Sequence, residues 1–369
     1  MSAPRVSVIM PARNSEAFIH QAIDSLLNQT FGAFEIVVVD GGSTDSTARI
    51  VEKLAAHDPR VRLHRQEHTG IVDGRNRGAS LARGEYLAWL DADDVALPLR
   101  LERQIAFMDA RPAVAASGAN IVVTDERLRP LLPVLYPTES RRIAESLVHQ
   151  NALAASTAII RAAAYDAVGG CRPSFKQGAE DYDLWLRLAE RWDLANIPVV
   201  LGYYRTHPGQ VSSTRVERFV LPSVAAQLSA RARREGRGDP YGELEQFTYD
   251  AFVQVEHSRA VIDTIVQDIA ANQAIFLSFI GQPREAGRLL EWTVRITSST
   301  ATPRRVRARM RLAQAVVLWN SPQRARALVP ALQSAFLDSP GATVMLARGA
   351  RARLARAIHS RRGSGSART

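Results

Sequence analysis

Short apolar runs alternate with amphipathic stretches over residues 1–214. The runs predict strands at 6–10, 34–40, 61–65, 86–90, 114–123, 158–160 and 199–204. Between them, apolar residues recur with helical spacing, and the first helix is expected to be capped by Asn14 or Ser15. Buried parallel strands are apolar on both faces, and strands that alternate with helices form parallel sheets. The pattern therefore predicts an α/β fold with three layers and a mainly parallel sheet.

The apolar pattern becomes helical from residue 215 onward. Helices are expected near 216–235, 242–281, 283–297, 303–319, 321–337 and 341–360, with glycine or proline between them. Residues 363–369 are rich in glycine and serine, a composition typical of a flexible tail. We therefore expect an α/β domain over 1–214, an arginine-rich α-helical region over 215–362, and the tail.

Composition narrows the class of protein: 46% of the residues are hydrophobic and 23% are charged, as in globular proteins. No apolar run approaches the roughly 18 residues that a membrane span needs. The N-terminus leads straight into a strand without a secretory signal. The single cysteine, Cys171, excludes an internal disulfide framework and a cysteine-based zinc site. Together these features predict a cytoplasmic protein.

The net charge of +10 is unevenly distributed. Residues 301–369 hold fourteen arginines, no lysine and one acidic residue, Asp338, so this segment carries +13 and the rest of the chain carries −3. Two interpretations stay open. Either the arginines contact an anionic membrane surface, where each basic side chain contributes about 1 kcal/mol, or they form the solvated face of a helical bundle.

The strand at 86–90 is followed by a group of carboxylates, Asp91, Asp93 and Asp94. Open α/β sheets bind ligands at the carboxyl ends of their strands, and carboxylates buried there need a cation beside them. Mg²⁺ and Mn²⁺ prefer oxygen ligands, and Mg²⁺ commonly binds one or two carboxylates together with substrate phosphates. The segment 91–93 therefore indicates a metal and diphosphate site, unless it is only a solvated loop that caps the next helix near Asp94.

Other strand ends carry groups that suit a nucleotide. Arg13 follows the first strand, and Asp40 ends the second, where Gly41 and Gly42 let the backbone turn tightly toward a ligand. No Gly-x-Gly-x-x-Gly or Walker sequence follows a strand, so dinucleotide-binding and P-loop proteins are poor alternatives.

A second acidic group, Glu180 and Asp181, precedes a helical apolar stripe at 184–188. Either carboxylate could be the N-cap of this helix or a reacting group. His207 follows the strand at 199–204 and is either a ligand at the site or an exposed loop histidine.

Six segments together resemble family 2 glycosyltransferases, an inverting family with the GT-A fold that includes bacterial cell-envelope polysaccharide enzymes. The segments are 6–14, 40–45, 74–78, 84–94, 180–187 and 204–207, in the order in which the family has them. The resemblance covers roughly residues 4–215, and the C-terminal region lies outside it.

The resemblance implies a role for each motif residue. Asp93 would bind Mg²⁺ or Mn²⁺, with Asp91 and His207 close to the metal. Asp181 would be the catalytic base, with Glu180 beside it as the other member of the family's acidic pair. The donor nucleotide would be held at the strand ends and at the start of one helix, by Pro11, Ala12, Arg13, Asp40, Gly41, Asp91 and Arg75.

Two positions depart from the family pattern. Arg13 stands where a tyrosine often stacks on the base, although a guanidinium group also stacks on rings. Gly41 stands where a second aspartate often contacts uracil. Sugars carried by UDP, GDP or dTDP therefore all stay open as donors.

The resemblance implies transfer of a sugar from a nucleotide-sugar donor to a saccharide or lipid-linked acceptor, in cell-surface polysaccharide or glycolipid synthesis. Membrane contact through the arginine-rich segment would place the enzyme on the inner face of the cell membrane. The alternatives are a catalytically inactive nucleotide-sugar-binding protein and a nucleic-acid-binding protein. No nucleic acid is expected as a partner, because no binding motif occurs and few aromatic residues, Trp319 among them, lie between the arginines.

Overall fold

The computed structural model describes residues 3–67, 70–210, 217–256, 258–297 and 302–320. Two compact units divide the chain, the first ending at Ile269 and the second beginning at Ala270. The first unit extends beyond the boundary expected at 214–215, because helix α9 (Glu217–Arg234) packs against helix α7 (Glu180–Ala189). The division into a domain over 1–214 and a helical region over 215–362 stays a prediction.

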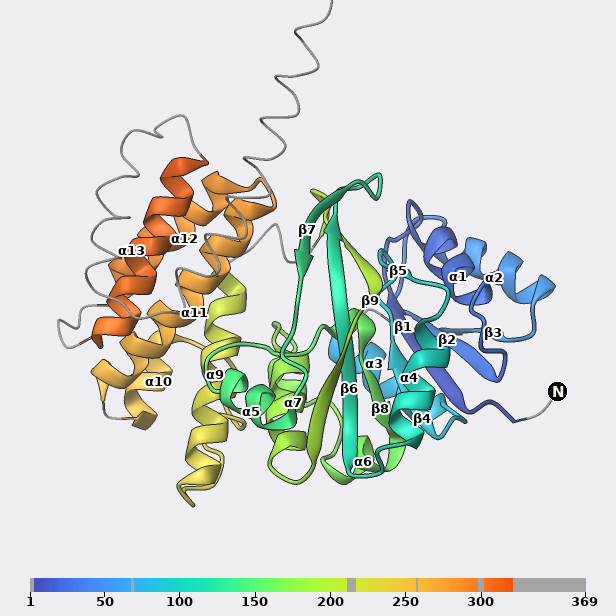
Figure 1. Cartoon of the computed structure of the whole chain (residues 1–369), viewed down its shortest axis with the longest axis horizontal. Helices are drawn as coiled ribbons and strands as arrows, with labels where there is room; N and C mark the ends of the chain where they lie inside the picture. Colours follow the sequence, from blue (N-terminus) through green and yellow to red (C-terminus); the bar gives the residue numbers. More distant parts are fainter. Residues whose placement is uncertain (1–2, 68–69, 211–216, 257, 298–301, 321–369) are drawn as a thin grey trace, which may run out of the picture. The chain divides into compact units, whose positions relative to one another are not determined.

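A mixed, mostly parallel sheet forms the centre of the first unit (Figure 1). Its strands are β1 (Val6–Ala12), β2 (Phe34–Asp40), β3 (Val61–Arg65), β4 (Tyr86–Trp89), β5 (Val95–Ala96), β6 (Val114–Thr124), β7 (Pro130–Val134), β8 (Ile159–Arg161) and β9 (Asp193–Arg205). They follow the order β3-β2-β1-β4-β8-β6-β9-β5, and β7 pairs with β6. β8 runs antiparallel to both β4 and β6, whereas β1 is parallel to β2 and β4, and β6 is parallel to β9.

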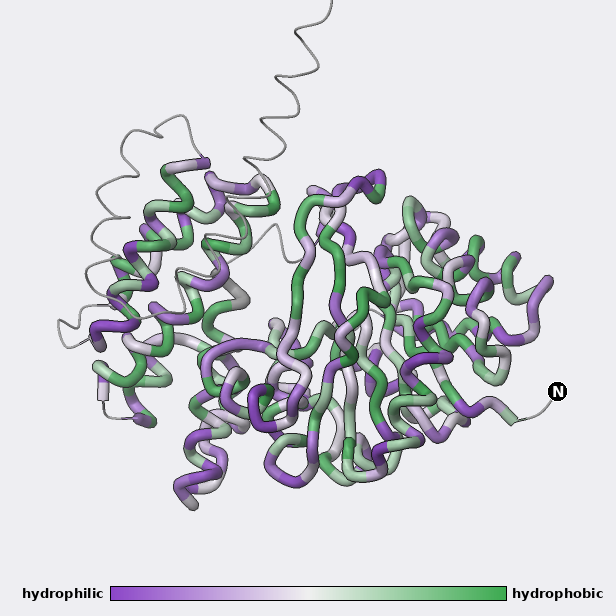
Figure 2. Tube along the Cα trace, in the orientation of Figure 1, coloured by the Kyte–Doolittle hydropathy of each residue, from purple (hydrophilic) through white to green (hydrophobic). Residues whose placement is uncertain are grey.

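Helices cover both faces of this sheet. Along β1, Val8 and Met10 pack with apolar residues of α1 (Ile19–Leu27), whereas Ile9 on the other face meets α3 (Ile71–Leu81). Figure 2 shows the apolar residues along the central strands. The other helices of this unit are α2 (Thr47–His57), α4 (Arg100–Asp109), α5 (Ser140–Leu147), α6 (Ala162–Ala167), α7, α9 and α10 (Tyr249–Glu256). The predicted three-layer α/β fold is confirmed.

The cap expected for the first helix is wrong, and so is the alternative in which Asp94 caps the next helix. α1 begins at Ile19 after Phe18 and has no side-chain cap. Asn14 has a φ of 49° and accepts a hydrogen bond from the N–H of Thr44 (2.9 Å), which ties the turn after β1 to the turn after β2. Asp94 precedes the short strand β5, and α4 starts only at Arg100, so this carboxylate is not a helix cap.

The expected helix at 242–281 is also wrong, because the structure has α10 and a separate α11 (Arg259–Phe279) there. Ring contacts of Tyr241 and Phe247 with Phe252 hold residues 241–247 as a turn instead of a helix. Helices α12 (Pro283–Ile296) and α13 (Arg304–Trp319) agree with the prediction. The helices expected at 321–337 and 341–360, the tail, and most arginines of segment 301–369 lie outside the described residues.

Among the described residues, α11 is long and apolar enough to cross a membrane by length and composition, with a mean hydropathy of 1.2 over its best window. The prediction that no apolar run approaches the length of a membrane span therefore has one exception, α11. Half of that window is buried, and the carboxylates of Asp263 and Asp268 are buried within the same helix. Since a core helix passes the same test, the feature is weak evidence for a span.

Two glycines let α3 lie unusually close to β1. A Cβ on Gly78 would stand 2.3 Å from Cγ2 of Ile9, and one on Gly74 would stand 3.0 Å from Cβ of Pro11. The spacing of four residues places both glycines on the face of α3 that meets the sheet. This close approach positions the side chain between them, Arg75, at the end of the neighbouring strand.

We expect Gly78→Ala to destabilise the protein, because overpacking of a close contact costs about 1–3 kcal/mol. The matched control is Gly287→Ala in α12, where the nearest atom to an added Cβ is 3.8 Å away. That change should be neutral or stabilising, since alanine is favoured over glycine in helices by about 1 kcal/mol. Urea unfolding followed by circular dichroism measures both; equal effects would contradict the close approach.

Candidate active site

A buried arginine lies at the centre of the predicted site. Arg75 is 2% exposed, and its guanidinium group lies 4.0 Å from the ring centre of Trp89. Its Nη1 donates to Oε1 of Glu180 (2.8 Å), and its Nη2 donates to Oδ1 of Asp91 (3.3 Å). One cation thus joins the loop after β4 to the start of α7, segments that lie about ninety residues apart in sequence.

Helix α7 starts with the two predicted acidic residues. Its N-cap is Ala179, in the left-handed conformation (φ 59°), so neither Glu180 nor Asp181 is the cap. Glu180 is buried against Arg75, whereas Asp181 is partly exposed. Burial raises the pKa of both carboxyl groups, and the charge of Arg75 opposes that rise.

The three aspartates after β4 have different partners. Asp91 bonds to Arg75, and its Oδ2 lies 3.3 Å from Oγ of Ser156. Asp94 is fully buried, contacts the same serine hydroxyl, and accepts the N–H of Arg205 (2.9 Å). Burial raises the pKa of Asp94 well above its usual range, and the charges of Asp93 and Asp91 raise it further.

Asp93 meets the histidine predicted beside it. Its Oδ2 lies 3.1 Å from Nε2 of His207, and its carbonyl oxygen accepts from Nε of Arg205 (2.6 Å). The ring of Phe18 contacts both His207 (4.6 Å between ring centres) and the guanidinium group of Arg205 (4.7 Å). Because the side chain of His207 is only 15% exposed, it is not an exposed loop histidine.

The predicted nucleotide-binding residues lie at the ends of β1 and β2. Ala12 pairs with Asp40 across these strands, and the N–H of Gly41 donates to the carbonyl of Ala12 (2.9 Å). The Asp40 carboxylate accepts the hydroxyl of Ser43 in its own turn. Arg13 is exposed beside them, and Pro11 is partly buried in β1. Since β1 also pairs with β4, these residues share the sheet edge that leads to Asp91.

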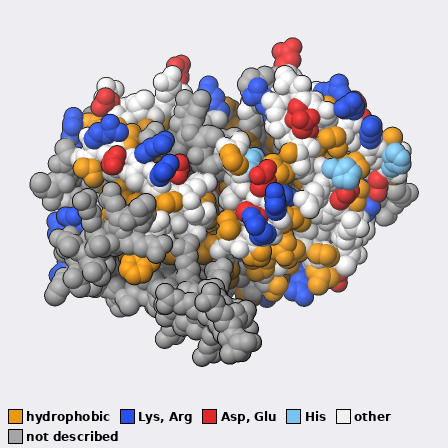
Figure 3. Space-filling view, turned by 90° about the horizontal axis from the view of Figure 1, so that it is seen from above, with side chains coloured by type: hydrophobic (Ala, Val, Ile, Leu, Met, Phe, Trp, Pro, Cys, Tyr) orange, Lys and Arg blue, Asp and Glu red, His pale blue; other side chains and the backbone are white. Residues whose placement is uncertain are grey.

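This edge is the face seen from above in Figure 3, where acidic, basic and histidine side chains lie close to one another. The structure joins Arg75, Asp91 and Glu180 in one cluster and Asp93 with His207 in a second. Among the described residues, no group of three or more His, Cys, Asp and Glu side chains is arranged to hold a metal ion. The metal ligands Asp91, Asp93 and His207 therefore stay a prediction.

Sequence reasoning missed several polar residues that hold the site together, namely Asn151, Ser156, Arg205 and Trp89. Asn151 donates to Asp181 (2.7 Å), and Ser156 contacts two of the aspartates. Neither stands in a recognisable motif, because their partners come from distant parts of the chain. Arg205 had a signal, since it directly follows the strand predicted at 199–204 and lies two positions before His207.

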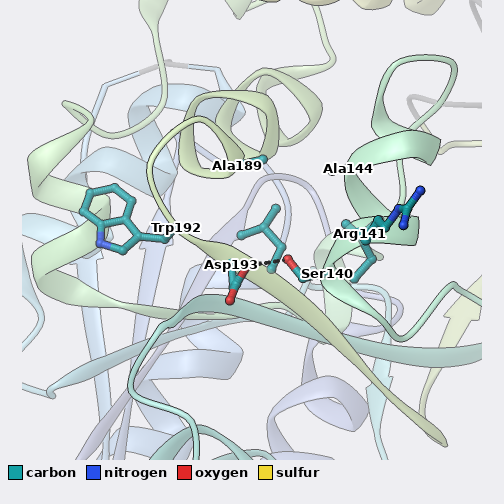
Figure 4. A pocket seen from close by; sticks show the side chains of 8 residues that line it. Ser140, Arg141, Ala144, Ala189, Trp192 and Asp193 are labelled. Atoms are coloured by element: carbon teal, nitrogen blue, oxygen red, sulfur yellow. Dashed lines mark hydrogen bonds between the residues drawn. The ribbon is translucent and has the colours of Figure 1, made fainter.

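A pocket of about 310 Å³ lies at the opposite end of β9 (Figure 4). It is lined by α5, the end of α7 and the start of β9, with the hydroxyl of Ser140 bonded to Asp193 (2.7 Å). Asp193 begins β9 and His207 follows its end, so the thirteen-residue strand separates them by roughly 40 Å at about 3.3 Å per residue. The pocket is not part of the predicted site.

Residues 7–169 match the family described as glycosyl transferase family 2. The chain is 30% identical over 221 residues to an Escherichia coli enzyme named UDP-Glc:alpha-D-GlcNAc-diphosphoundecaprenol beta-1,3-glucosyltransferase WfaP, covering 59% of this chain and 84% of that protein. The chain therefore belongs to glycosyltransferase family 2, an inverting family of enzymes.

Two solved structures share the fold. S. aureus TarS 1–349 in complex with UDP-GlcNAc superposes with a TM-score of 0.54 at 20% identity, covering 88% of this chain and 90% of that chain. The mannosyltransferase PcManGT from Pyrobaculum calidifontis, in complex with GDP-Man and Mn²⁺, has a TM-score of 0.51 at 21% identity, covering 91% and 87%. At these identities the likeness shows the fold alone, a mostly parallel α/β sheet followed by helices.

We expect Asp94→Asn to change how stability depends on pH in EDTA-treated protein. The folded protein holds the Asp94 proton more tightly than the unfolded chain, so the stability from this proton is present below the usual pKa and lost as pH rises through the raised pKa. The substituted amide does not titrate and retains partners for Arg205 and Ser156. Above about pH 4, the free energy of unfolding of the variant should therefore rise relative to that of the wild type. The difference should be about 1.4 kcal/mol for each tenfold difference in proton affinity between the folded and unfolded states.

Urea unfolding at several pH values measures this difference. The control is Asp166→Asn, which removes the same charge from an exposed residue of α6 and should follow the wild-type curve. Parallel curves for wild type and Asp94→Asn would mean that Asp94 titrates normally.

Proposed function

We propose that this enzyme transfers a sugar from a nucleoside-diphosphate sugar to a hydroxyl of a saccharide or lipid-linked acceptor, in the synthesis of a cell-surface polysaccharide. The observation that carries the proposal is the bridge of Arg75 between Asp91 and Glu180, because it brings the acidic pair to the strand end where the diphosphate would lie. The name of the E. coli relative, which specifies a lipid-linked acceptor, supports the acceptor class.

Asp181 is the group suited to act as base. Asp181 as a residue is partly exposed, and burial raises the pKa of its carboxyl group toward neutral pH, where general bases work best. The acceptor hydroxyl gives its proton to Asp181 as its oxygen bonds to the anomeric carbon. The bond from that carbon to the phosphate oxygen breaks, and its electron pair leaves with the nucleoside diphosphate. The configuration at the anomeric carbon is therefore inverted.

The donor set beside Asp93 suits Mg²⁺ or Mn²⁺ in its chemistry, with two carboxylates on one loop and one imidazole. Asp93, Asp91 and His207 would hold the ion, and diphosphate oxygens and water would supply the other ligands. When bound, the ion would supply positive charge against the departing diphosphate. Arg75 would hold Asp91 in place in this arrangement. The Mn²⁺ in the PcManGT complex supports the assignment.

The donor base stays open among uracil, guanine and thymine. The two solved neighbours carry UDP-GlcNAc and GDP-Man, and the relative uses UDP-Glc by its name. Arg13 is exposed directly after β1, and its guanidinium group would stack on any of these bases. A cytoplasmic location, with membrane contact through segment 301–369, remains part of the proposal.

Asp181→Asn should bind donor normally and lose transfer, because general-base catalysis contributes typically about 10²–10⁴-fold. Binding of UDP-glucose and GDP-mannose is measured by calorimetry, and turnover by release of nucleoside diphosphate. Asp166→Asn, on the exposed surface of α6, is the matched control and should keep full activity. Near wild-type turnover by Asp181→Asn would show that Asp181 is not the catalytic base.

Asp93→Ala and His207→Ala should lose the Mn²⁺-dependent part of the stabilisation by UDP or GDP in a thermal-shift assay. A ligand at a hundredfold its dissociation constant stabilises by about 2.7 kcal/mol, so the loss is measurable. The matched controls are Asp24→Ala and His20→Ala, an exposed aspartate–histidine pair on α1 with a 2.9 Å contact. Equal Mn²⁺ dependence in all four variants would rule out the proposed ligands.

A further inference from the structure

Asn151 has a fixed orientation between α5 and the short helix η1 (Ala155–Thr157). Its Oδ1 accepts the N–H of Leu153 (3.2 Å), and its Nδ2 donates to Oδ2 of Asp181 (2.7 Å). An asparagine that bonds to the backbone two residues later closes a local turn. Because the amide oxygen is used in this turn, the amide nitrogen must face Asp181.

The Asp181 carboxylate is held at both oxygens. Oδ1 accepts the N–H of Tyr182 (2.7 Å), and Oδ2 accepts Asn151. A carboxylate oxygen has two lone pairs, so each oxygen can still accept a proton from a substrate hydroxyl. Two donors from different segments fix the plane of the carboxylate, which one donor would leave free to rotate.

The connection that carries Asn151 also reaches the aspartate loop. Ser156 lies five positions later, and its hydroxyl contacts Asp91 and Asp94. A single short segment thus touches the carboxylate of α7 on one side and the strand-end aspartates on the other. Its length sets the separation between these two parts of the site.

We propose that Asn151 is a positioning residue that orients Asp181 toward the acceptor hydroxyl. The proposal rests on the proposed function, in which Asp181 is the base. The ionisable groups that face Asp181 are Arg75 from α3, Glu180 and Tyr182 on its own helix, Asp91 from the loop after β4, and Tyr136. Arg75 and the two hydrogen bonds favour the charged carboxylate, and burial opposes it.

Two substitutions separate positioning from a structural role. Asn151→Ala removes both bonds of the side chain. Asn151→Asp keeps an oxygen for the N–H of Leu153, so the turn is preserved, but it places a second carboxylate against Asp181. Gln150→Ala, an exposed change in the same segment, is the control for folding and should behave as wild type.

The assay follows release of nucleoside diphosphate from UDP-glucose or GDP-mannose, whichever the protein binds, with Mn²⁺ and with water as the acceptor. We expect kcat to fall roughly 10²-fold in both Asn151 variants, the usual cost of a misplaced catalytic group. The acid limb of the kcat–pH profile should move to higher pH, further for Asn151→Asp than for Asn151→Ala. The donor dissociation constant should change less than about twofold, because substitutions couple energetically mainly to groups that they contact.

Ser156→Ala provides a contrast within the same segment. It should weaken donor binding through Asp91 and leave the acid limb in place. An acid limb that moves equally in Ser156→Ala would show a general effect of the segment and overturn the proposal. A fully active Asn151→Asp would do the same, because it would show that only the turn matters.

A measurement without turnover tests the contact itself. In unfolding experiments, the double variant Asn151→Ala, Asp181→Ala should show coupling of about fivefold in the equilibrium constant, as groups in direct contact do. Additive effects would overturn the inference while leaving the base role of Asp181 intact. The proposed function itself fails separately, through an active Asp181→Asn or a wild type that binds no donor.

Discussion

The buried guanidinium group of Arg75 is the interaction on which the site depends. A guanidinium group that is only 2% exposed is stable only when other groups replace the water that would surround its charge. Here two carboxylates and the ring of Trp89 take that place. The contact requires α3 to lie close to the sheet, which Gly74 and Gly78 permit. The site therefore depends on one structural unit, which consists of the two glycines of α3, Arg75, the end of β4 and the acidic pair at the start of α7.

Helix α7 is held by ionic contacts with several segments of the chain. Its first turn meets Arg75, and farther along, the buried Asp183 bonds to Arg187 (2.9 Å) and to Arg172. Arg172 also pairs with Asp239, in the segment after α9. Residues beyond the family match at 7–169 thus help to fix the helix that carries Glu180 and Asp181. This anchoring explains why the first compact unit continues past residue 214.

Three aspartates within four positions have separate tasks because their side chains leave the loop in different directions. Asp91 faces Arg75, Asp93 faces His207, and Asp94 turns inward to bind the backbone of Arg205. The buried Asp94 joins the loop to the end of β9, and so it keeps Asp93 beside His207. Positive charge near this loop relieves the repulsion among the three carboxylates.

The sequence by itself determined the α/β class, most strand positions, and the residues that gather at the carboxyl edge of the sheet. Apolar periodicity and strand-end polar groups are local signals, and parallel strands bring their carboxyl ends to one edge whatever their order. Only the tertiary structure decided that β8 is antiparallel, that α10 and α11 are separate, and that Arg75 bridges Asp91 and Glu180. It also decided the partners of Asn151, Ser156 and Arg205. The physical reason is that a buried polar group is satisfied by whichever donor or acceptor the fold brings near, and this partner can lie anywhere along the chain.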